Sequence, residues 1–176
     1  MSLGYWEKED LAFVLSYLRS VSASRPIALW GRGMGAVAAL LQMKEDHGIA
    51  AAILDSPYKS LPELSKELAH RVSSAPDILL NQVIKLVSKS IRKHANFDLM
   101  TLIPIQDIEN THTPALFATA LQDSFISPHH SEALLQAYGA QKKKIVKFEG
   151  DHNSPRPLYF LQEATGFLVE AFRPAA

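Results

Sequence analysis

Apolar and polar positions along the chain follow two patterns, one typical of helices and one typical of buried strands. Residues 7–20 carry apolar side chains at positions 11, 14, 15 and 18, the spacing of a helix with one buried face. Short apolar runs bounded by turn residues predict strands at 26–30, 49–54, 113–121 and 144–148. Further helices are predicted at 36–44, 127–138 and 157–172. This alternation predicts an α/β fold, a three-layer α/β/α sandwich around a mostly parallel sheet.

Residues 60–108 do not follow the alternation and are predicted to form a mostly helical insertion within a single domain that spans 1–176. Segment 76–95 combines a broad apolar stripe with a basic side, formed by Lys85, Lys89, Arg92 and Lys93. We interpret the insertion as a cap packed over one edge of the site. Two alternatives stay open, an amphipathic helix lying on a membrane surface and a helix that binds a partner protein.

Composition narrows the classes of function. The chain has 176 residues, with 18 Lys plus Arg against 18 Asp plus Glu. Because positive charge is not in excess, we expect no nucleic-acid partner. There is no cysteine, which excludes disulfides, thiolate catalysis and cysteine-ligated zinc. No apolar run approaches the ~20 residues that span a bilayer, and the first residues lack a signal-peptide pattern, so we expect a cytoplasmic protein.

The strongest local signal is Gly31-Arg-Gly-Met-Gly35, which lies between a predicted strand and a predicted helix. The nucleophile elbow of serine hydrolases is Gly-x-Ser-x-Gly in the same context, and its outer glycines let strand and helix approach closely. Here Gly33 occupies the central position. The turn is not specific by itself, because any tight connection between a strand and a helix could have this sequence.

Candidate partners for this turn follow the later strands. In hydrolases of this type, the acid and the histidine come after the nucleophile, in that order. Asp123 follows the third predicted strand and His152 follows the fourth, so we predict that they are hydrogen-bonded neighbours near Gly33. Asp55, after the second strand, is a weaker rival acid and is interpreted as a turn-former. The other histidines are interpreted as surface residues: His47, His70, His94, His112, His129 and His130.

Four segments are informative together, namely GRGMGA (31–36), LDSP (54–57), QDSFISPHH (122–130) and FEGDHNSPR (148–156). They resemble segments of eukaryotic α/β-hydrolases of the serine-aminopeptidase-like branch, and the resemblance runs over about 4–172. It implies an ester-, thioester- or amide-hydrolysing Ser-His-Asp triad, a small-molecule, acyl or peptide substrate, and no metal or organic cofactor. It assigns the acid to Asp123, the base to His152 and the serine position to Gly33. The backbone N–H of Met34 is the implied oxyanion donor.

Two departures from the family pattern change the expected function. Gly33 has no side chain, so the chain is predicted to lack serine-hydrolase activity. The alternatives are a non-catalytic pseudohydrolase that binds or scaffolds, and a membrane-surface adaptor that uses the basic helix. The family's sheet normally has eight strands, of which we identify only the last four. We therefore expect strand 26–30 to present an open edge, which favours self-association or pairing with a separate front half.

Overall fold

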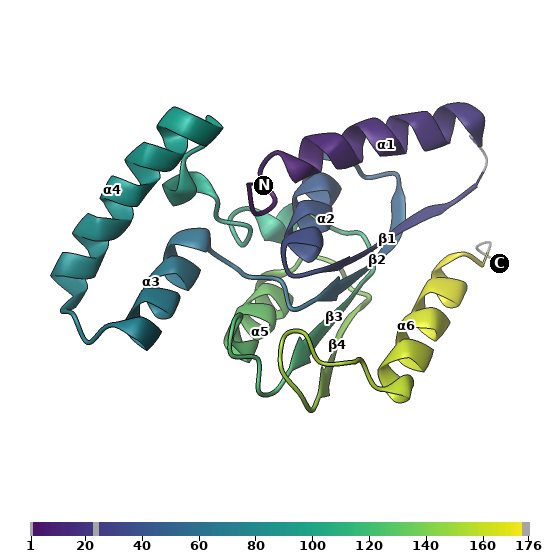
Figure 1. Cartoon of the computed structure of the whole chain (residues 1–176). Helices are drawn as coiled ribbons and strands as arrows, with labels where there is room; N and C mark the ends of the chain where they lie inside the picture. The colour runs from purple at the N-terminus through teal and green to yellow at the C-terminus, as the bar shows by residue number, and fades with distance from the viewer. Residues whose placement is uncertain (1, 23–24, 174–176) are drawn as a thin grey trace.

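The computed structural model describes residues 2–22 and 25–173. Within these residues it has four β-strands and six α-helices, arranged as in Figure 1. The strands are β1 (Ile27–Arg32), β2 (Ile49–Asp55), β3 (Ala115–Ala120) and β4 (Lys143–Phe148). The α-helices are α1 (Glu7–Val21), α2 (Met34–Glu45), α3 (Leu61–Val72), α4 (Asp77–Ala95), α5 (Pro128–Ala137) and α6 (Leu158–Ala171). The 3-10 helices are η1 (Leu99–Thr101) and η2 (Ile108–Asn110).

The four strands form one parallel sheet in the order β1-β2-β3-β4. Their registers bring the carboxyl ends together, since Arg32 pairs with Asp55 and Ala120 pairs with Phe148. Loops that leave these ends therefore gather at one side of the sheet, where ligands bind in folds of this type. Within the described residues, β1 is an edge strand. The predicted α/β fold with a parallel sheet is confirmed.

Side chains alternate along the buried strands and build a core on each face of the sheet. On β2, Ala52 and Leu54 belong to a cluster with residues of α1, α2 and α5. Ala51 and Ile53 belong to a second cluster, together with Phe160 and other residues of α6. Helices thus cover both faces, as Figure 1 shows, and the expected three layers are present.

Helices α3 and α4 form a hairpin that projects from the sheet, at the left of Figure 1. The Ser60 side chain caps α3 by accepting the backbone N–H of Glu63 at 3.4 Å. Leu64 of α3 and Ile84 of α4 share a buried cluster with Val37 of α2, so the hairpin packs on the body of the domain. Among the described residues, no helix combines the length and apolar character needed to cross a membrane.

Candidate active site

The connection between β1 and α2 is a tight turn centred on Gly33. Its backbone has φ +52° and ψ −115°, a conformation that glycine adopts at little steric cost and other residues rarely adopt. The Gly33 N–H donates to the carbonyl of Asp55 at 2.8 Å, which ties the turn to the end of β2. A Cβ on Gly31 would lie 2.3 Å from the backbone of Gly35, so strand and helix approach too closely for a side chain there.

The side chain that Gly33 lacks would point at His152. A Cβ built at position 33 would lie 3.0 Å from Nε2 and 3.3 Å from Cε1 of the imidazole. Met34 follows as the first residue of α2, where backbone N–H groups have no partner within the helix. The turn therefore places an N–H donor of Met34 next to the position that faces the histidine.

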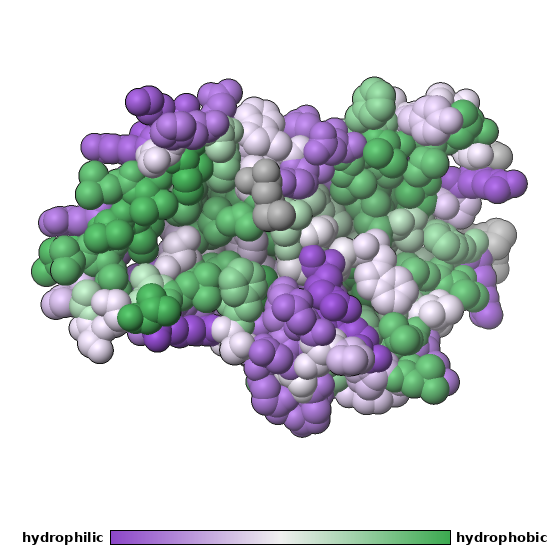
Figure 2. All heavy atoms as spheres, viewed as in Figure 1, coloured by the Kyte–Doolittle hydropathy of each residue, from purple (hydrophilic) through white to green (hydrophobic). Residues whose placement is uncertain are grey.

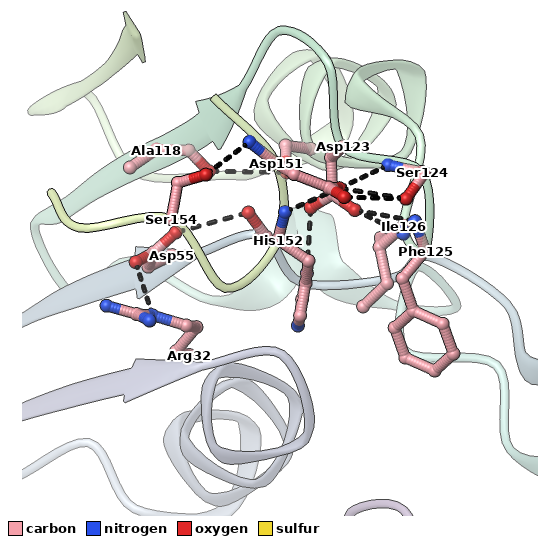
Figure 3. Close-up of polar contacts among 12 residues, drawn as sticks. Arg32, Asp55, Ala118, Asp123, Ser124, Phe125, Ile126, Asp151, His152 and Ser154 are labelled. Carbon is pink, nitrogen blue, oxygen red and sulfur yellow. Dashed lines mark hydrogen bonds and ion pairs between the residues drawn. The ribbon is translucent and has the colours of Figure 1, made fainter. Parts of the chain in front are cut away.

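Asp123 and His152 are hydrogen-bonded, with 2.7 Å between Oδ2 and Nδ1 (Figure 3). The other oxygen of Asp123 accepts the N–H groups of Phe125 at 2.9 Å and Ile126 at 2.7 Å. Because the ionised carboxylate can only accept, Nδ1 carries the proton and the Nε2 lone pair faces position 33. Burial opposes ionisation of Asp123, but the hydrogen bonds from His152, Ile126 and Phe125 outweigh it and lower its pKa.

Polar contacts of Asp151 tie the loop that carries His152 to the loop after β3. The Asp151 carboxylate accepts the His152 N–H at 2.7 Å and the Ser124 N–H at 2.6 Å. The loop after β3 and the loop after β4 are thus joined beside the Asp123–His152 pair (Figure 3). These contacts hold the imidazole over the glycine turn.

An Asp55–Arg156 ion pair under the His152 loop was missed by the sequence analysis. Arg156 donates from Nε to Oδ2 of Asp55 at 2.8 Å and from Nη2 to Oδ1 at 3.0 Å, and both side chains are buried. The same guanidinium donates to the carbonyls of His152 at 2.9 Å and Ser154 at 2.8 Å. Asp55 is therefore an anchor for this loop, which corrects its interpretation as a turn-former. The arginine four residues after the histidine was the available signal.

The prediction that His130 lies at the surface was wrong. Its side chain is fully buried, because the first turn of α5 packs against α3, and its Nε2 lies 3.1 Å from Oε2 of Glu67. Burial lowers the pKa of His130, and the Glu67 carboxylate only partly opposes this. His129 lies half-buried beside it, with its Nε2 3.2 Å from Glu67. The histidines that are exposed as predicted are His47, His70, His94 and His112.

Glu67, His129 and His130 are also the groups of the described chain that could ligate a metal ion, since their ligand atoms lie within 4.8 Å of one another. The two imidazole rings lie 4.2 Å apart with planes inclined by 31°. Both Nε2 atoms lie close to the Glu67 carboxylate, at 3.2 Å for His129 and 3.1 Å for His130. We interpret the cluster as a polar link between the hairpin and the body.

An apolar pocket of about 110 Å³ opens next to the glycine turn. Its lining combines the start of α2, the loop after β3 and one face of α3: Leu3, Met34, Tyr58, Leu61, Leu64, Ser65, Leu68, Phe125 and Ile126. Phe125 also packs edge-on against the His152 imidazole, with ring centroids 5.3 Å apart. The pocket and the acid–base pair are therefore parts of one site.

Solved structures of similar fold match nearly the whole chain. An esterase of Pyrococcus furiosus, Pf2001, matches 97% of this chain with a TM-score of 0.73 and 17% identity. The chain has an α/β-hydrolase-like fold. An acetyl xylan esterase from Paenibacillus sp. R4 matches 95% of it with a TM-score of 0.64 and 19% identity, and a puromycin hydrolase matches 96% with a TM-score of 0.68 and 18% identity.

The chain is shorter than these neighbours. It spans 64% of the Pyrococcus esterase, 51% of the acetyl xylan esterase and 26% of the puromycin hydrolase. No protein-family model and no curated protein sequence matches it. At these low sequence identities, the similarity shows a shared fold only.

Proposed function

We propose that this chain is a pseudohydrolase, which binds a small acyl or peptide ligand in an α/β-hydrolase-like site without forming an acyl-enzyme. One observation carries the proposal: a side chain at position 33 would lie 3.0 Å from Nε2 of His152, and residue 33 is glycine. The esterases and the hydrolase among the structural neighbours support ester, thioester or amide hydrolysis as the chemistry from which the site derives.

The proposed chemistry follows from the roles of the three positions. With a serine at position 33, His152 would take the hydroxyl proton on Nε2, and Asp123 would hold the imidazolium through Nδ1. Met34 would donate its N–H to the oxyanion that forms on the attacked carbonyl. Gly33 supplies no oxygen for the attack, so no covalent intermediate forms. The His152–Asp123 pair can still activate water, but such general-base catalysis contributes only about 10²–10⁴-fold.

The pocket beside Met34 suits a short apolar group of the ligand. Its volume of about 110 Å³ equals roughly three to four water molecules at about 30 Å³ each. We propose that residues 60–108 act as a cap, because Leu61, Leu64 and Leu68 of α3 form one wall of this pocket. A cytoplasmic location stays a prediction.

A fluorophosphonate probe, which labels activated serines covalently, tests the proposal. Intact-mass analysis should find no adduct on the chain, and ester hydrolysis should show no initial burst from an acyl-enzyme intermediate. A stoichiometric adduct on Ser56 or Ser124 would show that another serine is the nucleophile. Binding without turnover is then measured by the shift of the His152 ring signals in NMR spectra as a short-chain fatty acid is added.

A further inference from the structure

Helix α4 has a wider apolar surface than its packing uses. Leu80, Ile84 and Ser88 face the interior of the hairpin and are buried. A neighbouring stripe at i, i+4, i+7 and i+8 is 46–65% exposed, and it consists of Leu79, Val83, Leu86 and Val87. We name these four residues the outer stripe. Figure 2 shows the hydrophobic colour extending over the region of α4 and the adjoining part of α3.

The tip of the hairpin carries two further exposed apolar side chains. Val72, the last residue of α3, and Ile78, in the first turn of α4, are 87% and 76% exposed. Apolar side chains that gather at an exposed surface in this way are characteristic of an interaction site. It lies on the insertion, outside the sheet and its two core clusters.

Helix α4 carries only positive charges after its first residue, although the whole chain has no net charge. Between Asp77 and Asp98 there are four Lys or Arg residues and no Asp or Glu. Arg92 lies 3.7 Å from Asp98, but among the described residues no carboxylate lies within 4 Å of the ammonium groups of Lys85, Lys89 and Lys93. These lysines repeat every four residues and are exposed, so they form a basic row along the helix.

We propose that α4 docks on an anionic membrane surface, with the outer stripe in the headgroup–acyl boundary and the three lysines at the phosphates. A helix with an apolar face, a basic polar face and low net hydrophobicity lies in the plane of a membrane interface. The acid-free span of α4 is complementary to the anionic lipids of the cytoplasmic leaflet. The proposal does not depend on the hydrolase-like site, since no residue of the outer stripe lines the pocket.

Co-sedimentation with lipid vesicles tests the charge part of the proposal. The full chain should bind vesicles of phosphatidylcholine with phosphatidylserine, bind phosphatidylcholine alone much more weakly, and dissociate as salt is raised. Each lysine near such a surface contributes roughly fivefold to binding, so Lys85→Gln, Lys89→Gln and Lys93→Gln together should weaken it about a hundredfold. A matched control changes Lys142, Lys144 and Lys147 to Gln, which alters net charge equally and should leave binding within severalfold.

A second set of variants tests the contribution of the outer stripe to membrane binding. Leu79→Gln, Val83→Gln and Leu86→Gln should remove binding, whereas the control Phe13→Gln, Tyr17→Gln and Val21→Gln on exposed positions of α1 should not. Leu86→Gln alone, at a residue 65% exposed, replaces the triple variant if that does not fold. Absence of binding to phosphatidylserine vesicles overturns the proposal. So does a control variant that loses as much vesicle binding as the α4 variant with which it is compared. So does size-exclusion data showing that the outer-stripe variant dissociates a dimer, because the stripe would then cover a second copy.

Discussion

Gly33→Ser tests the candidate site most directly. A Cβ at this position would lie 3.0 Å from Nε2 of His152, so the added hydroxyl would come within hydrogen-bonding reach of the imidazole. Because Nδ1 donates to Asp123, Nε2 is free to accept the hydroxyl proton. The variant should therefore react with a fluorophosphonate probe, whereas the chain with Gly33 should not.

The same substitution should also lower stability, by an amount that depends on the backbone conformation of residue 33. Gly33 has φ +52°, and a non-glycine residue in a sparsely populated conformation costs about 1–3 kcal/mol. The close contact of the new Cβ is with the imidazole of His152, a side chain that can shift by a few tenths of an ångström. In a domain of this length, 1 kcal/mol lowers Tm by about 2–4 °C, so we expect a decrease of about 2–12 °C.

Turnover of a simple ester by Gly33→Ser should stay low even where the probe reacts. Met34 is the one oxyanion donor that we assign, and hydrolases of this type draw a second from another loop. Loss of one such donor reduces the rate by roughly 10²–10³. The assay is the release of p-nitrophenol from p-nitrophenyl acetate, compared with probe labelling on the same preparation.

Gly35→Ser is the matched control, because a Cβ there would meet no atom within 4 Å. It should neither be labelled nor lose stability, and adding His152→Ala to Gly33→Ser should abolish labelling. A folded Gly33→Ser variant that is not labelled would refute the assignment of this turn as the nucleophile position. Robust ester turnover would instead show that the chain assembles a complete oxyanion hole, which contradicts our expectation of a partial fold.

Three further predictions address separate contacts. Asp55→Asn should lower the free energy of unfolding by about 3–5 kcal/mol, because Arg156 keeps a buried charge without its partner. Arg32 also pairs with Asp55, at 3.1 Å, but its side chain is 44% exposed, so urea unfolding would contradict this if Asp55→Asn cost no more than Arg32→Gln. Between about pH 7 and pH 5, stability should fall as pH falls, because burial lowers the pKa of His130 while the unfolded histidine protonates near its usual value. Thermal melts that show the same fall in His130→Gln would contradict this. Light scattering at low micromolar concentration should show association through β1, and a stable 19.5 kDa monomer would show that this edge is covered from within.

The elements could be predicted where the apolar period and the turn residues agreed. The first helix was expected at 7–20 and is Glu7–Val21, and the last strand was expected at 144–148 and is Lys143–Phe148. The strand expected at 113–121 starts later, at Ala115, because Pro114 precedes it and has no N–H for the ladder. Helix α2 starts two residues before the expected position, because Gly33 alone makes the turn and Gly35 is already helical.

Contacts between distant segments could not be predicted, because they produce no periodic pattern in the local sequence. Asp55 and Arg156 are separated by 101 residues, and only the fold brings the end of β2 under the loop after β4. The burial of His130 depends on α3, whose Glu67 lies 63 residues earlier. The order of Asp123 and His152 was informative for a different reason, since parallel strands end at one edge of the sheet and any loop residues there become neighbours.

The Asp123–His152 pair and position 33 differ in what they contribute to the folded structure. The buried Asp123 carboxylate accepts hydrogen bonds from His152, Phe125 and Ile126, so losing the imidazole would leave a buried charge with one partner fewer. The acid–base pair therefore stabilises two loops whether or not a reaction takes place. Position 33 differs, because its backbone conformation penalises any side chain, and such strain is retained only where a function uses it. Glycine removes that penalty together with the nucleophile, so the proposal of a non-catalytic site depends on residue 33 and not on the pair that faces it.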